Sequence, residues 1–76
     1  MGRFPTIRAA ELIKFLKARG YVTDRQRGSH LILWHPGLRQ SVSVPVHTGY
    51  DLGRGLTLQI LKQAGFAAED FLNWRR

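Results

Sequence analysis

The chain contains no cysteine and few acidic residues. Without cysteine among its 76 residues, it forms neither disulfides nor thiolate metal sites. A small domain without disulfides or thiolate metal sites is typical of a reducing compartment, so we predict a cytoplasmic protein. With five Asp and Glu residues in all, few side chains other than histidine are available for chemistry.

Long apolar runs are also missing. None approaches the roughly 18 residues that a membrane-spanning helix needs, and Met1–Pro5 lacks the apolar core of a signal peptide. We therefore expect a soluble protein with no membrane partner. The apolar share of 43% suffices for a folded core. The length predicts one domain over residues 1–76, with a core over about 7–66 and a C-terminal helical extension over 67–76.

Positive charge is plentiful. Twelve Lys and Arg residues against five Asp and Glu give a net charge of +7. Such a field favours polyanions, of which nucleic acid is the commonest. A solubility surface or a basic face for an acidic protein accounts for the charge equally well, so charge alone does not decide among them.

Apolar periodicity predicts helices at both ends of the chain and strands between them. In order, we expect a helix over 7–19, strands over 21–26, 30–35 and 39–46, a loop over 47–55, and helices over 56–64 and 67–74. The first helix carries an apolar stripe of Ala9, Leu12, Ile13 and Leu16. Thr6 is its predicted N-cap and Gly20 its stop.

The later segments complete a simple architecture. Pro36-Gly37 predicts a turn, and Pro45 predicts an edge strand or a strand end. The helix over 56–64 has an apolar stripe of Leu56, Ile60, Leu61 and Ala64, and Gly65 ends it. The order predicts an α+β fold, in which helices cover one face of a three-stranded antiparallel sheet and a short extra helix follows. The other face is left open to a ligand.

Gly28-Ser29-His30 stands out as a candidate site. It places an imidazole at the start of a strand, after two turn-prone residues, with Arg25 and Arg27 just before it. By pattern alone, a histidine here is more often a structural hydrogen-bonding group than a catalyst. The arginines are equally compatible with a solvated face, and Trp34 is more simply a core or sheet-surface residue than a platform for a nucleic-acid base.

Other chemistries fit the sequence poorly. His30 and His35 fall on opposite faces of a regular strand, which disfavours a shared metal ion. Ser29 and His30 diverge as neighbours, which disfavours a serine hydrolase. We therefore predict neither a metal nor a cofactor.

Cleavage of an RNA phosphodiester bond requires fewer protein groups than a metal site or a serine hydrolase. The 2′-hydroxyl is a tethered nucleophile, so the protein must only move protons and stabilise charge on the phosphate. An imidazole can transfer the proton and arginines can hold the phosphate. His30 with Arg25 and Arg27 matches this inventory, with Ser29 and His47 as weaker neighbours.

The chain resembles the HicA family of small toxins, the mRNA-cleaving halves of HicA–HicB toxin–antitoxin pairs. The resemblance covers residues from about 8 to 66 and is carried by Glu11-Leu12-Ile13-Lys14-Phe15-Leu16, Gly20-Tyr21, Arg27-Gly28-Ser29-His30, His35-Pro36, Val42-Ser43-Val44-Pro45, His47, Gly55 and Ile60-Leu61-Lys62-Gln63-Ala64-Gly65. Each piece is weak alone, but the ordered set is specific. Gly55-Leu56-Thr57-Leu58, where relatives often have Gly-Thr-Leu, and Leu31, where a polar residue is frequent, depart from the pattern.

The resemblance implies a fold, an activity and a partner. The fold would be like that of double-stranded-RNA-binding domains. The activity would be endoribonucleolytic cleavage of mRNA, which arrests translation, with His30 as the catalytic residue. The partner would be a HicB-type antitoxin that covers the active site. A non-catalytic RNA-binding module of the same fold is the alternative, and a protein-interaction domain with a basic face is a third hypothesis.

Overall fold

A three-stranded antiparallel sheet and three helices form the body of the protein. The computed structural model describes residues 4–46 and 51–76. Its elements are β1 (Ile7–Arg8), α1 (Ala9–Ala18), β2 (Val22–Arg27), β3 (His30–His35), β4 (Gln40–Pro45), β5 (Asp51–Leu52), α2 (Arg54–Ala64) and α3 (Ala68–Arg75). The sheet has the order β2-β3-β4, and β1 pairs with β5 in a separate two-stranded ribbon. The predicted α+β fold is confirmed.

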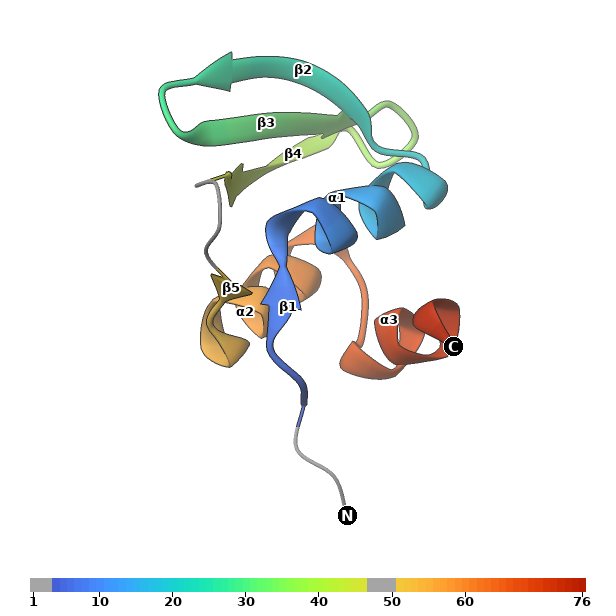
Figure 1. Cartoon of the computed structure of the whole chain (residues 1–76). Helices are drawn as coiled ribbons and strands as arrows, with labels where there is room; N and C mark the ends of the chain where they lie inside the picture. Colours follow the sequence, from blue (N-terminus) through green and yellow to red (C-terminus); the bar gives the residue numbers. More distant parts are fainter. Residues whose placement is uncertain (1–3, 47–50) are drawn as a thin grey trace.

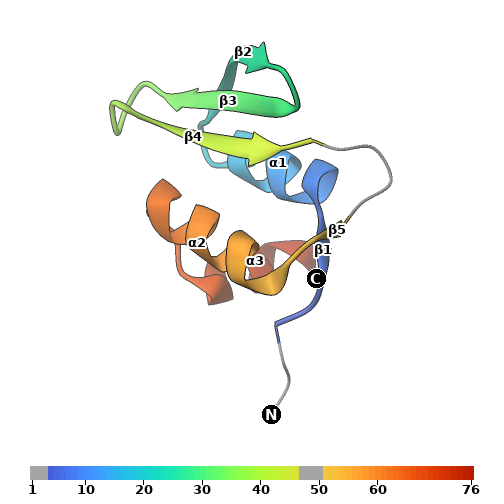
Figure 2. The same ribbon diagram turned by 90° about the vertical axis from the view of Figure 1, so that its left-hand side faces the viewer.

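The helices lie on one side of the sheet. In Figures 1 and 2, α1 and α2 run beneath β2-β3-β4, and α3 lies on the far side of α1 and α2 from the sheet. Alternation along the strands turns Leu33, Val42 and Val44 toward the helices, and all three are buried. The opposite face of the sheet carries none of the described helices (Figure 2). Pro45 lies on an edge strand, as predicted.

Two glycines end the first two helices. Gly20 has a φ of 104° after α1, and Gly65 has a φ of 94° after α2. Glycine adopts such left-handed conformations at little energetic cost because it has no Cβ, which explains why the helices stop there. Both stops match the sequence prediction. The Phe15 ring, which lies beside the predicted apolar stripe of α1, is fully buried and belongs to the core.

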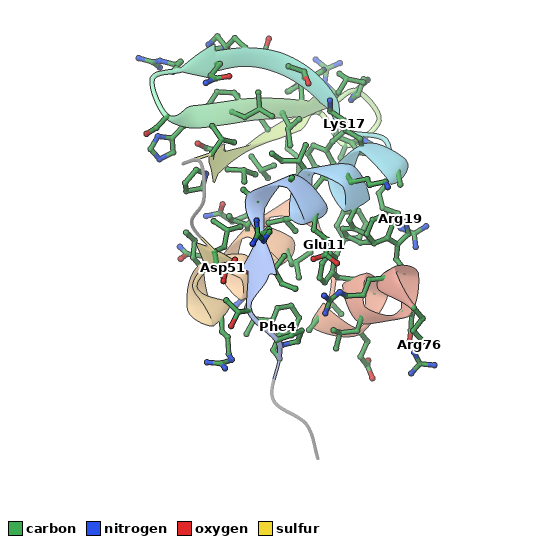
Figure 3. The ribbon with its side chains drawn as sticks, in the orientation of Figure 1. Phe4, Glu11, Lys17, Arg19, Asp51 and Arg76 are labelled. Carbon is green, nitrogen blue, oxygen red and sulfur yellow. The ribbon has the colours of Figure 1, made fainter. Side chains whose placement is uncertain are left out.

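An aromatic cluster attaches α3 to the rest of the protein. The Phe71 ring is fully buried and meets the Phe15 ring edge-on, with 5.2 Å between centroids. The Trp74 ring lies 5.4 Å from the same Phe15 ring. Glu11, which points from α1 toward α3 in Figure 3, accepts a 2.7 Å hydrogen bond from Arg75 Nε. The C-terminal helix is thus part of this core.

His35 ties the end of the sheet to the end of α1. Its Nδ1 accepts a hydrogen bond of 3.0 Å from the Leu38 N–H, so its Nε2 carries the proton and donates to the Arg19 carbonyl at 2.9 Å. The ring also meets Tyr21 edge-on, 4.9 Å between centroids. Gly20 makes room for it, because a Cβ there would lie 2.6 Å from His35 Nε2.

The predicted start of the first helix is wrong. Ile7 and Arg8 form β1, pairing with Leu52 and Asp51, and the helix begins at Ala9 after Arg8 as N-cap. Thr6 therefore does not cap the helix. The pairing partner is more than 40 residues away in the sequence, so a local apolar pattern does not reveal it.

The predicted loop and second helix also need correction. Within the range 47–55, Asp51–Leu52 form β5 and Arg54 begins α2, two residues before the predicted start. Leu56 is 39% exposed rather than core. Thr57 is buried in its place, because its hydroxyl donates a 3.0 Å hydrogen bond to the Gly53 carbonyl and so needs no water.

Candidate RNA-cleaving site

A two-residue hairpin turn places His30 opposite Arg27. Gly28 and Ser29 connect β2 to β3, and Gly28 has a φ of 58°, the conformation that the first central residue of a type II′ turn requires. The short turn fixes the register, so Arg27 and His30 are direct cross-strand partners. Side chains of such partners lie on the same face with Cβ atoms about 5 Å apart. The turn therefore brings a guanidinium and an imidazole together.

A β-bulge at Asp24 decides which face the arginines occupy. Thr23 pairs with Leu33, but the next pair is Arg25 with Ile32, so Asp24 is an extra residue without a partner. Because Leu33 faces the helices, Ile32 and its partner Arg25 face the other way. Without the bulge, the alternation from Thr23 would turn Arg25 and Arg27 toward the helices. The extra residue thus places both predicted arginines on the outer face with His30.

The outer face of the sheet consists of three cross-strand rows. Reading from the turn, they are Arg27–His30–Pro45, Arg25–Ile32–Ser43 and Val22–Trp34–Ser41. His30 is exposed, whereas His35 lies on the inner face, as the strand alternation predicted. Each of the first two rows contains an arginine, beside His30 and Pro45 in the first row and beside Ile32 and Ser43 in the second, whereas the third row is mostly apolar. We refer to these three rows as the outer face.

A shallow hollow lies at the turn end of the outer face. It has a volume of about 510 Å³ and is lined by Arg27, Gly28, His30, Ile32 and Ser43. None of these lining residues is acidic, so an anion entering the hollow meets the Arg27 guanidinium without a competing carboxylate. The hollow can therefore accept a phosphate group beside the His30 ring.

The other predicted site residues differ in what they can contribute. Arg25 Nη1 already bonds Asp24 Oδ2 at 2.6 Å in an exposed ion pair, so its charge is partly offset. Ser29 is half-buried in the turn, and its carbonyl accepts a 2.7 Å hydrogen bond from the Val46 N–H, which fastens the turn to the end of β4. His47 lies outside the described residues.

Two residues that line the hollow were not predicted as parts of the site. Ile32 and Ser43 line the hollow with His30. Both could have been found, because Ile32 is two residues from His30 on the same strand and Ser43 falls on the polar side of the third strand. The bulge at Asp24 has no comparable signal in the sequence.

Comparison with known families bears on this geometry. The chain matches a family model described as the HicA toxin of bacterial toxin–antitoxin systems, over residues 9–66. This chain belongs to the HicA toxin family. No match was found among curated proteins.

The HicA match spans the whole outer face and excludes the last helix. It runs from the start of α1 to just beyond α2, so α3 lies outside it. Membership gives the chain the role of a toxin with a cognate antitoxin. In the described part of the chain, no helix is long and apolar enough to cross a membrane. Residues 4–46 and 51–76 contain no cluster of three or more His, Asp or Glu side chains suited to a metal ion.

Proposed function

We propose that this HicA-family chain is an endoribonuclease that cleaves mRNA without a metal ion, with His30 as general acid or base. The observation that carries the proposal is the pairing of His30 with Arg27 on the outer face, beside a hollow free of carboxylates. An exposed imidazole beside a guanidinium supplies a proton-transfer group next to a phosphate anchor. The neighbouring His35 has both ring nitrogens engaged in the fold and is not available for this role.

The reaction needs little from the protein. The RNA 2′-oxygen attacks the adjacent phosphorus, the bond from phosphorus to the 5′-oxygen breaks, and a 2′,3′-cyclic phosphate and a 5′-hydroxyl result. His30 takes the proton of the 2′-hydroxyl or donates a proton to the leaving 5′-oxygen, and water completes the balance. Arg27 offsets the charge that develops on the phosphate oxygens.

The remaining predicted residues have supporting roles in this proposal. Arg25 contacts a neighbouring phosphate, and Ser29 shapes the turn that carries His30. His47 is a further candidate for contact with the RNA. The cognate antitoxin would be of the HicB type and would cover the outer face, which none of the described helices occupies.

An RNA cleavage assay in EDTA tests the proposal. The parent protein and His30→Ala are incubated with the same mRNA, and the product ends are identified. We expect the parent to produce 2′,3′-cyclic phosphate ends in EDTA and His30→Ala to be slower by about 10²–10⁴-fold. Equal rates would disprove the assigned role of His30. RNA binding without cleavage by the parent would instead indicate the non-catalytic RNA-binding module.

Expression in cells gives an independent readout. Induction of the parent should arrest growth, and induction of His30→Ala should not. A growth arrest that persists with His30→Ala, at equal protein levels, would separate toxicity from the proposed chemistry.

A further inference from the structure

We infer that Trp34 is a stacking platform for an unpaired RNA base close to the cleaved bond. This inference rests on the proposed function, because it assigns a second contact of the same RNA strand. Trp34 lies on β3 four residues after His30, so both side chains leave the strand on the outer face. Trp34 is 38% exposed, although burial of so large an aromatic side chain would stabilise the fold.

The surroundings of Trp34 suit a planar ligand. Its cross-strand neighbours are Val22 on one side, 49% exposed, and Ser41 on the other. Serines occupy both outward positions in the middle of β4, at Ser41 and Ser43. Both serines are exposed, and their hydroxyl groups can form hydrogen bonds with a ligand.

The distance from the proposed reaction site fits one RNA strand. Four residues of β-strand span about 13 Å at 3.3 Å per residue. Stacked nucleotides rise about 3.4 Å each, so this distance corresponds to about four nucleotides, and to fewer in an extended strand. A strand whose phosphate lies at Arg27 and His30 can therefore place a base at Trp34 when it follows β3.

The chemistry of the face favours single-stranded nucleic acid. Arg25 and Arg27 supply cations for the backbone, and Trp34 supplies an aromatic surface for a base. This combination is typical of proteins that bind single strands with little sequence preference, because every base has a π face. Paired bases in a duplex would not expose that face.

A binding experiment with an uncleavable RNA tests the inference. The probe is a labelled random-sequence decamer of 2′-O-methyl RNA, which lacks the nucleophilic hydroxyl. Trp34→Leu keeps an apolar side chain but removes the aromatic ring, and we expect it to weaken binding about 5-fold or more. Trp34→Phe should recover most of the affinity. Leu38→Ala, at another exposed apolar residue, which lies in the turn after β3, is the matched control and should bind as the parent does.

Fluorescence reports on the same contact directly. The chain has two tryptophans, and the second, Trp74, packs on Phe15. Trp74→Phe leaves Trp34 as the sole indole, and the decamer should quench its emission. If Trp34→Leu binds as tightly as the parent, or if the Trp34 emission does not change on saturation, the stacking assignment is wrong.

A positional readout separates stacking from a structural effect. In a cleavable RNA, single abasic positions are scanned within four nucleotides of the cleaved bond on either side. One abasic position should slow the parent and leave Trp34→Leu unaffected. If the parent neither binds nor cleaves RNA, the proposed function itself fails. If the parent is active but every abasic position affects Trp34→Leu and the parent alike, only the stacking assignment fails.

Discussion

The two histidines at the ends of β3 have opposite environments. His35 faces the helices, and both of its ring nitrogens are hydrogen-bonded to the backbone. His30, five residues earlier, faces away from the helices and lines an open hollow with Arg27. An odd separation along a strand accounts for the difference, since successive residues point to opposite faces. The same kind of side chain therefore holds the fold together at one end of β3, whereas at the other end it forms no hydrogen bond with residues 4–46 or 51–76 and faces the hollow.

The largest expected effect is on activity and comes from His30→Ala. We expect cleavage to fall by about 10²–10⁴-fold, while the free energy of unfolding changes by no more than about 0.5 kcal/mol, because an exposed side chain is removed. Urea denaturation and a cleavage time course measure the two quantities on one preparation. A large loss of stability would show that His30, like His35, is a structural residue.

The largest expected effect on stability comes from Gly20→Ala. The substitution places a Cβ 2.6 Å from His35 Nε2 at a φ of 104°, so it adds backbone strain of about 1–2 kcal/mol to the loss of the His35 contacts. We expect a total near 3 kcal/mol. Gly28→Ala is the matched control, because Gly28 also has a positive φ but an added Cβ there would meet no atom of the described residues within 4 Å. Urea denaturation should show that Gly28→Ala costs less. Equal costs would mean that the close approach to His35 does not matter.

A somewhat smaller loss is expected from His35→Ala. It removes two hydrogen bonds, each contributing about 1 kcal/mol, so these bonds account for a loss of about 2 kcal/mol. The edge-on contact with Tyr21 is lost as well. Thermal unfolding followed by circular dichroism measures this loss. If His35→Ala were as stable as the parent, His35 would not have the structural role that its hydrogen bonds indicate.

The smallest effects concern the two arginines. Arg27 lines the hollow, whereas Arg25 is paired with Asp24, so Arg27→Ala should weaken RNA binding more than Arg25→Ala. If Arg27 contacts one phosphate, its removal should lower the slope of log affinity against log salt by about 0.7. Titrations of 2′-O-methyl RNA at several salt concentrations measure this slope.

Asp24→Asn tests whether the ion pair with Asp24 limits the contribution of Arg25 to RNA binding. It releases the Arg25 guanidinium from its ion pair and should strengthen RNA binding. Weaker binding by Asp24→Asn, with the fold intact, would show that the bulge residue has another role on the outer face.

Much of the fold followed from local patterns. The β3 strand has its predicted bounds, 30–35, because turn residues flank a short apolar run. The β1–β5 ribbon and the burial of Thr57 were missed, since each depends on a contact that the alternation of apolar and polar residues does not encode.

The candidate site was predictable in its residues but not in its geometry. Arg25, Arg27 and His30 were selected for their chemistry and their closeness in sequence, and all three lie on the outer face. Their common face depends on the extra residue Asp24 in β2, and no turn or glycine signal marks a bulge at that position. The exposure of His30 likewise depends on which face of the sheet the helices cover.

The most direct test of this account compares His30→Ala and His35→Ala in one cleavage assay. Both variants are assayed with the parent in EDTA, at a temperature where denaturation curves show all three proteins folded, and rates are expressed per folded molecule. The account predicts that His35→Ala cleaves RNA at close to the parental rate and leaves 2′,3′-cyclic phosphate ends, while His30→Ala is slower by about 10²-fold or more. The account would be contradicted if His30→Ala cleaved RNA at the parental rate. It would also be contradicted if only His35→Ala lost cleavage activity while remaining folded.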